Sequence, residues 1–162
     1  MKYAGLLIII VIAGCKQSGN ETKELKTRID SLQQKLDNAY KPGFGEFMSG
    51  IQVHHAKLWF AGINNNWELA DFEIHEITES LESLQKFQPE RKEVASLPML
   101  NPAIDSLNTA IKNKNLVQFK SSYLLLTNSC NSCHKSVDYS FNEVKIPETP
   151  PFSNQVFGKK EK

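Results

Sequence analysis

The chain places two thiols and an imidazole within five consecutive residues, Cys130-Asn131-Ser132-Cys133-His134. This spacing matches C-x-x-C-H, the signature for covalent attachment of c-type haem. Thiols about one helical turn apart can reach the two vinyl groups of one porphyrin, and the histidine that follows is held beside the iron as an axial ligand. We therefore predict one haem c, with thioethers at Cys130 and Cys133 and with His134 as the iron ligand.

Other chemistries also use closely spaced cysteines. A structural zinc site needs four ligands, and His54, His55 and His75 form no second pair with zinc-finger spacing. A thioredoxin-like redox pair lies near a strand-helix unit, and no segment of this chain alternates with a strand's period of two. A disulfide between residues three apart on one helix would constrain little. Haem attachment is therefore the preferred interpretation.

The start of the chain predicts export. "MKYAGLLIIIVIAGC" has one basic residue and then an apolar run, which is shorter than the roughly 20 residues that span a bilayer and suits a secretory signal. Its end, "IAGC", resembles a bacterial lipobox. We expect residues 1–14 to be removed and Cys15 to carry lipid that anchors the protein to a bacterial membrane, facing the periplasm or the cell exterior. The alternative is an ordinary signal peptide, or a small apolar anchor, with an unmodified cysteine.

The charge balance limits the partners. Removal of residues 1–14 removes Lys2 and no acidic residue, so that 19 basic residues become 18, against 18 acidic ones. Binding of nucleic acid needs a basic face, so we expect no nucleic-acid partner. The expected partners are a redox protein, a small gas ligand and, through the lipid on Cys15, a membrane. A homodimer is an open alternative.

Apolar residues recur every three or four positions in four successive segments, as in amphipathic helices. These segments are residues 44–63, 67–87, 104–111 and 116–133. The asparagines at 64–66 supply an N-cap for the second segment, and Pro98 and Pro102 bracket the loop before the third. Four such helices joined by short loops predict an all-α fold, an up-down-up-down four-helix bundle over residues 44–137.

The bundle is flanked by two further segments. Residues 15–43 contain a linker and an amphipathic stalk helix with apolar residues at alternating spacings of four and three: Leu25, Ile29, Leu32, Leu36 and Ala39. This heptad stripe covers barely two repeats, so a plain amphipathic helix and a coiled-coil stalk are equally open. Residues 138–162 have three prolines and no helical period. They predict an extended tail that can lie on the bundle through Phe152 and Phe157.

A C-x-x-C-H motif late in the chain, on the last helix of a four-helix bundle, resembles the class II cytochromes c of the cytochrome c-prime type. The resemblance covers roughly residues 44–137. It implies haem iron bound by His134, thioethers at Cys130 and Cys133, and either electron transfer or small-gas binding. The chain departs from that family in its stalk and in residues 138–162. We expect an exported monohaem cytochrome that transfers one electron at a time. The alternative is a five-coordinate haem protein that binds nitric oxide or carbon monoxide.

The bundle topology also predicts what faces the iron. It places the end of the last helix beside the start of the first, so Phe44, Phe47 and Met48 should lie at the level of His134, together with loop residues Phe87, Met99 and Leu100. The Met48 thioether could be the sixth iron ligand and would then raise the reduction potential. Alternatively, Met48 only packs near the porphyrin, and the sixth site stays open, as the resemblance implies.

His54 and His55 lie about 10 Å further along the same helix than Met48, at 1.5 Å per residue. We therefore expect core histidines rather than iron ligands, in a polar layer with these residues: Trp59, Trp67, Asp71, His75 and Glu76. A peroxidase-like or nitric-oxide-reducing activity would use a distal histidine–arginine pair. The only arginines, Arg28 and Arg91, are not expected near the motif, so we do not predict an enzyme.

Overall fold

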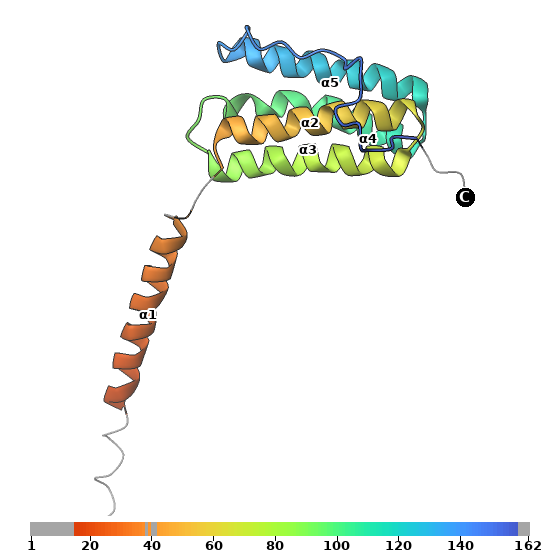
Figure 1. Cartoon of the computed structure of the whole chain (residues 1–162). Coiled ribbons are helices and arrows are strands. Elements are labelled where there is room, and N and C mark those ends of the chain that lie inside the picture. Colours follow the sequence, from red (N-terminus) through yellow and green to blue (C-terminus); the bar gives the residue numbers. More distant parts are fainter. Residues whose placement is uncertain (1–14, 38, 40–41, 159–162) are drawn as a thin grey trace, which may run out of the picture. The chain divides into compact units, whose positions relative to one another are not determined.

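The computed structural model describes residues 15–37, 39 and 42–158. Every regular element within these residues is a helix, which confirms the predicted all-α class (Figure 1). The predicted signal peptide, residues 1–14, lies outside the described part. The chain divides into two compact units, of which the first contains helix α1 and the second begins at Pro42. Among the described helices, none is both long enough and apolar enough to cross a bilayer.

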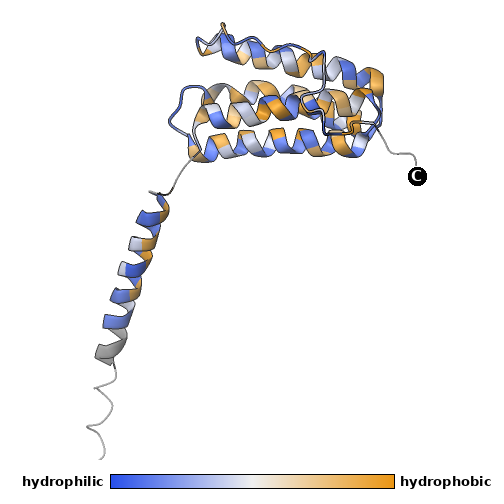
Figure 2. Ribbon diagram, in the orientation of Figure 1, coloured by the Kyte–Doolittle hydropathy of each residue, from blue (hydrophilic) through white to orange (hydrophobic). Residues whose placement is uncertain are grey.

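Helix α1 spans Cys15–Asp37, so the predicted stalk helix is present. It begins at Cys15, where a linker was expected, and it ends before Ala39, the last residue of the predicted stripe. Its polar face carries an ion pair one turn apart, in which the Arg28 guanidinium lies 2.9 Å from the Glu24 carboxylate. Its apolar stripe is exposed to solvent, with exposed fractions that range from 59% at Leu25 to 66% at Leu36. Figure 2 shows this stripe as an orange line along one side of an otherwise blue helix.

Within residues 42–158, the described part of the second unit, there are four α-helices and one 3₁₀-helix. They are α2 (Phe44–Ile63), α3 (Trp67–Phe87), η1 (Val94–Leu100), α4 (Asn101–Lys112) and α5 (Leu116–Ser136). The four predicted helical segments are therefore confirmed. The predicted N-cap is present too, since the Asn66 side chain accepts a hydrogen bond from the Leu69 amide at 3.3 Å, and Asn115 caps α5 in the same way through Gln118 at 3.0 Å.

The segment between α3 and α4 differs from the expected irregular loop. It contains η1, with Pro98 inside it, and Pro102 lies in the first turn of α4 rather than before the helix. Proline is tolerated there because the first amides of a helix have no intrahelical acceptor. The prediction that the two prolines bracket a loop is therefore wrong.

Packing brings the helices of this unit together in a closed cycle. Helix α2 contacts α3, α3 contacts α4, α4 contacts α5, and α5 contacts α2, while η1 contacts α3, α4 and α5. The apolar faces meet in one core, whose largest fully buried side chains include Leu58, Ile74, Leu107, Phe119 and Tyr123. Burial of such side chains is the main source of stability for these helices.

The tail returns along the helices after α5. The chain reverses at Asp138, whose φ of 71° is left-handed, and the described residues beyond it contain no helix (Figure 1, blue). Phe157 is buried against Phe60 of α2, with ring centroids 5.7 Å apart, which confirms the predicted contact. Phe152 stays 42% exposed, with the Lys57 ammonium 5.5 Å from its ring centroid.

Candidate functional site

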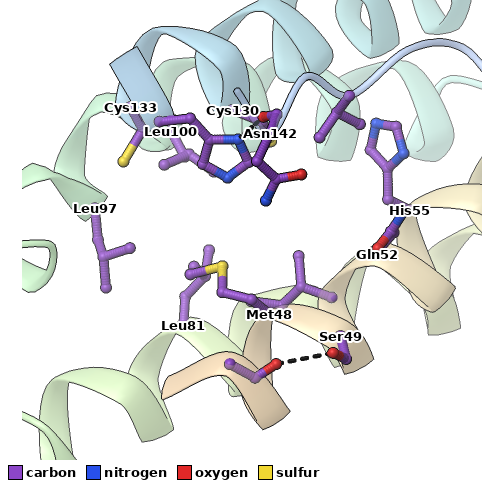
Figure 3. Close-up of a pocket in the computed structure, with 14 residues that line it drawn as sticks. Met48, Ser49, Gln52, His55, Leu81, Leu97, Leu100, Cys130, Cys133 and Asn142 are labelled. Atoms are coloured by element: carbon purple, nitrogen blue, oxygen red, sulfur yellow. Dashed lines mark hydrogen bonds between the residues drawn. The ribbon is translucent and has the colours of Figure 1, made fainter. Parts of the chain in front are cut away.

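One cavity of about 230 Å³ brings together the residues of the C-x-x-C-H motif and Met48. Its walls come from α2, α3, η1, α5 and the tail. Met48 reaches into it from α2 and Cys133 from α5 (Figure 3). Leu81, Leu97 and Leu100 make much of the remaining wall apolar. Residues that are 82 or more positions apart in sequence thus share one site.

The two thiols of the motif are free and largely buried. Burial raises the pKa of the Cys130 thiol to about 12, and the neighbouring Cys133 adds to this shift. Burial also raises the pKa of Cys133, with a contribution from the Glu93 carboxylate. Both groups are therefore neutral thiols near pH 7. A thioredoxin-like redox pair depends on a low thiol pKa, so this environment disfavours that alternative.

His134 lies in the last turn of α5, and one of its ring nitrogens is hydrogen-bonded to a residue of the tail. Its Nδ1 is 2.6 Å from the backbone oxygen of Asn142. A carbonyl oxygen can only accept, so Nδ1 carries a proton and, in the neutral ring, Nε2 keeps its lone pair. Metal-bound histidines are commonly held in this way by an acceptor at the other ring nitrogen.

These residues fit a covalently held haem. Two neutral thiols, an imidazole with Nε2 available, a thioether and apolar leucines line the same space. The cavity follows α2 from Gly45 to His55, which is about 15 Å at 1.5 Å per residue. No group of three or more His, Cys, Asp or Glu that could hold a bare metal ion occurs among the described residues.

His55 borders the inner end of the cavity and is 4% exposed. Its Nδ1 lies 2.9 Å from the Tyr123 hydroxyl, and its Nε2 lies 3.0 Å from Oγ1 of Thr127. Burial lowers the pKa of His55 to about 4, so the ring is neutral at pH 7. The prediction of a hydrogen-bonded core histidine is confirmed, whereas its position on the same cavity as Met48 was not predicted.

The predicted polar layer is wrong in part. His75 is exposed and pairs with Glu79 at 3.2 Å, and Asp71 is exposed as well. His54 does lie near the predicted Glu76, with 4.0 Å between Nε2 and the carboxylate. Its shorter contact is with Glu73, a fully buried carboxylate whose Oε2 lies 2.7 Å from Nδ1 of His54. The Lys57 ammonium lies 3.7 Å from the other oxygen of Glu73.

Glu73 could have been found from the sequence. It lies three residues after Ala70 and four before Ile77, on the apolar stripe of α3. A carboxylate in a buried stripe signals a paired charge in the core. The cavity residues Asn142 and Val144 carried no comparable signal, because they lie in a segment without periodicity.

The two phenylalanines predicted as haem contacts do not line the cavity. Phe47 stacks on Phe87, with ring centroids 6.3 Å apart. The ring of Phe44 contacts the Arg91 guanidinium, whose Cζ lies 5.0 Å from the ring centroid. Both pack against the core. Met99 is 44% exposed and also outside the cavity.

Arg91 is linked through Glu93 to Tyr139, in the chain that follows the motif. Its Nη2 donates to the Glu93 carboxylate at 2.7 Å, and the Tyr139 hydroxyl donates to the same oxygen at 3.2 Å. The Arg91 hydrogen bond holds the pKa of Glu93 at about 2, well below its usual range. Arg91 does not line the cavity, so the cluster fastens the α3–α4 connection to the chain that follows the motif.

Cys15 is the first residue of α1, and its side chain lies outside the described atoms. Comparisons of the chain with protein-family models, with curated proteins and with solved structures find no match. The function is therefore inferred from the residues and geometry of the site.

Proposed function

We propose that this chain is an exported, lipid-anchored c-type cytochrome that carries one covalent haem and transfers one electron at a time. The observation that carries the proposal is the shared cavity of Cys130, Cys133, His134 and Met48. When bound, the haem supplies an iron that cycles between two oxidation states. The protein attaches it at two sulfurs, holds it through Nε2 of His134 and keeps water away with the leucine walls.

We also propose that α2, α3, α4 and α5 form an up-down-up-down four-helix bundle like that of cytochromes c-prime. The closed cycle of contacts among these helices supports this arrangement. The short turns at residues 64–66 and 113–115 support it too, because short connections join antiparallel neighbours. In such a bundle, the start of α2 and the end of α5 meet at one end, where Met48 and His134 share a cavity.

The decisive experiment is mass spectrometry of the denatured protein after co-expression with a haem-attachment system. We expect the mass of one haem to be added to the wild-type chain and to resist acid–acetone extraction. Cys130→Ala and Cys133→Ala should each leave a single thioether and a poorly held cofactor. Cys15→Ser is the matched control, because it removes the third cysteine and should retain the haem. A native preparation with zinc and no covalent haem would refute the proposal.

Binding of a small gas is the second candidate function. The observation that favours it is that the cavity extends beyond Met48 to Gln52, an exposed side chain whose amide can donate a hydrogen bond to a bound diatomic molecule. Carbon monoxide added to the ferrous protein distinguishes the two functions. Rapid binding supports the gas binder, whereas resistance to binding supports a carrier with a closed sixth site.

A further inference from the structure

The first variable residue of the motif, Asn131, is joined to the tail by two hydrogen bonds. Its Nδ2 donates to the Val144 carbonyl at 2.8 Å, and the Val144 amide donates to its Oδ1 at 2.8 Å. One orientation of the side-chain amide satisfies both bonds. Asparagine is not favoured in the interior of a helix, because its side chain competes for the backbone hydrogen bonds. Here its side chain instead joins α5 to the tail.

Asn131 and His134 face the same stretch of tail. They are three residues apart on α5 and therefore lie on one side of that helix. Their tail partners are backbone groups of Val144 and Asn142, which are two residues apart in a stretch without helix or turn. The tail is thus paired with α5 at two points, one at Asn131 and one at the His134 ring.

The other end of this tail segment is fastened as well. The Tyr139 amide donates to the His134 carbonyl at 2.8 Å, and Asp138 makes the reversal with its left-handed φ of 71°. The Tyr139 hydroxyl is held by Glu93 at 3.2 Å. The chain from Tyr139 to Val144 is consequently a strap fixed at both ends, and the Asn142 carbonyl in its middle has little freedom to leave the imidazole.

We propose that Asn131 is a positioning residue that acts through this strap, residues 139–144, to fix the tautomer and ring orientation of His134. Asn131 holds Val144, Val144 sets the position of the Asn142 carbonyl, and that carbonyl keeps the proton on Nδ1. The consequence for the iron rests on the proposed function. A hydrogen-bonded imidazole is a more basic ligand, so the strap favours the ferric state and lowers the reduction potential.

The first test needs no cofactor. Nitrogen NMR of the full-length chain, labelled at histidine and expressed without haem attachment, reports the tautomer of His134. We expect the Nδ1–H form in the wild type and a mixture of tautomers in Asn131→Leu, because leucine has the same branched shape as asparagine but cannot form hydrogen bonds. Ser132→Ala is the matched control, because it changes the exposed neighbouring motif residue and should leave the tautomer unchanged.

A second variant covers the risk that Asn131→Leu disturbs α5. Val144→Pro removes the amide that donates to Asn131 and leaves the helix sequence intact. We expect the same loss of the single tautomer. An unchanged tautomer in either folded variant, even with lower thermal stability, would overturn the proposal and would mean that Asn131 only attaches the tail.

The haem-loaded protein supplies an independent readout. The midpoint potential of Asn131→Leu should shift upward relative to wild type, whereas that of Ser132→Ala should not change. An unchanged or lower potential in Asn131→Leu would overturn the inference for the iron. If no haem is attached at all, the proposed function fails, while the tautomer measurement still decides whether Asn131 positions His134.

Discussion

The hydroxyl of Tyr123 on α5 lies 2.9 Å from Nδ1 and 2.8 Å from the backbone oxygen of His55 on α2. This contact joins two helices at the inner end of the cavity. Thr127 completes it, since its Oγ1 lies 3.0 Å from Nε2 of His55 and donates to the Tyr123 carbonyl. Burial raises the pKa of Tyr123, so its phenol stays protonated and available to His55.

This buried histidine predicts a pH dependence of stability. The folded-state pKa of His55 is about 4 against 6.5 when unfolded, so between these values only the unfolded chain binds the proton. The free energy of unfolding should fall by about 3 kcal/mol as the pH drops through this window, at about 1.4 kcal/mol per unit. Urea unfolding of the cofactor-free chain at a series of pH values measures it.

His55→Gln is the control for that experiment, because it removes the titrating group. Its free energy of unfolding should change much less between pH 6.5 and 4. Among the described residues, Glu93 is also buried, and its pKa is lowered to about 2. Its contribution to stability is therefore lost mainly below pH 4, outside this window. Equal slopes in wild type and His55→Gln would contradict the prediction.

The variant Met48→Ala tests whether the Met48 thioether occupies the sixth coordination site of the iron. If the thioether is a ligand, the ferric wild-type protein is low-spin, and the variant becomes high-spin and binds carbon monoxide when reduced. If Met48 only packs, the wild type is already high-spin, and the variant changes gas affinity alone. Met48 is only half-buried, so the truncation should cost about 2 kcal/mol, the low end for methionine. A low-spin spectrum that survives Met48→Ala would point to another ligand.

Gly62 in α2 is predicted to resist substitution because the Phe119 ring of α5 packs where a Cβ would lie. Gly62→Ala should lower the free energy of unfolding by about 1–3 kcal/mol, as overpacking does, despite the better helix propensity of alanine. Gly50 in the same helix has open space within 4 Å of the corresponding Cβ position. Gly50→Ala should therefore raise stability by up to about 1 kcal/mol. Denaturant unfolding of both variants makes the comparison.

Lipidation of Cys15 is tested by metabolic labelling with a tagged fatty acid. The wild-type chain should be labelled and should sediment with membranes. Cys15→Ser removes the acceptor thiol and should abolish both the label and the membrane association. Equal labelling of the two proteins would show that the lipid, if present, is attached elsewhere.

We expect the stripe on α1 to pair with a second copy of this chain as a parallel coiled coil. The spacing puts Ile29 at a and Leu32 at d, a combination that favours two strands, and both are more than 60% exposed. Glu21 at g would then face Lys26 at e of the partner helix. Leu32→Lys should convert a dimer to a monomer in sedimentation equilibrium. Gln34→Lys, which adds the same charge on the opposite face, should not. A wild-type monomer at every concentration would refute the pairing.

The local elements could be predicted because their causes are local in sequence. Helices α2 and α3 begin and end where the apolar period and the breakers indicate. The C-x-x-C-H motif needs only one helical turn to bring its groups together. The up-down-up-down topology predicts Met48 near His134, and the two residues do line one cavity.

Periodicity and short spacing act within a few residues, so the sequence was sufficient to predict the helical class and the bounds of α2 and α3. It also showed that Cys130, Cys133 and His134 lie within about one helical turn. The folded structure was needed to show that the Asn142 carbonyl accepts a hydrogen bond from His134, that Glu73 pairs with His54, and that the cavity reaches His55. These contacts join segments that have no mutual sequence pattern. Burial explains the contacts of Glu73 and His55, because a polar group removed from water is costly unless the fold supplies a partner. The exposed contact of His134 with Asn142 depends instead on where the tail returns along α5.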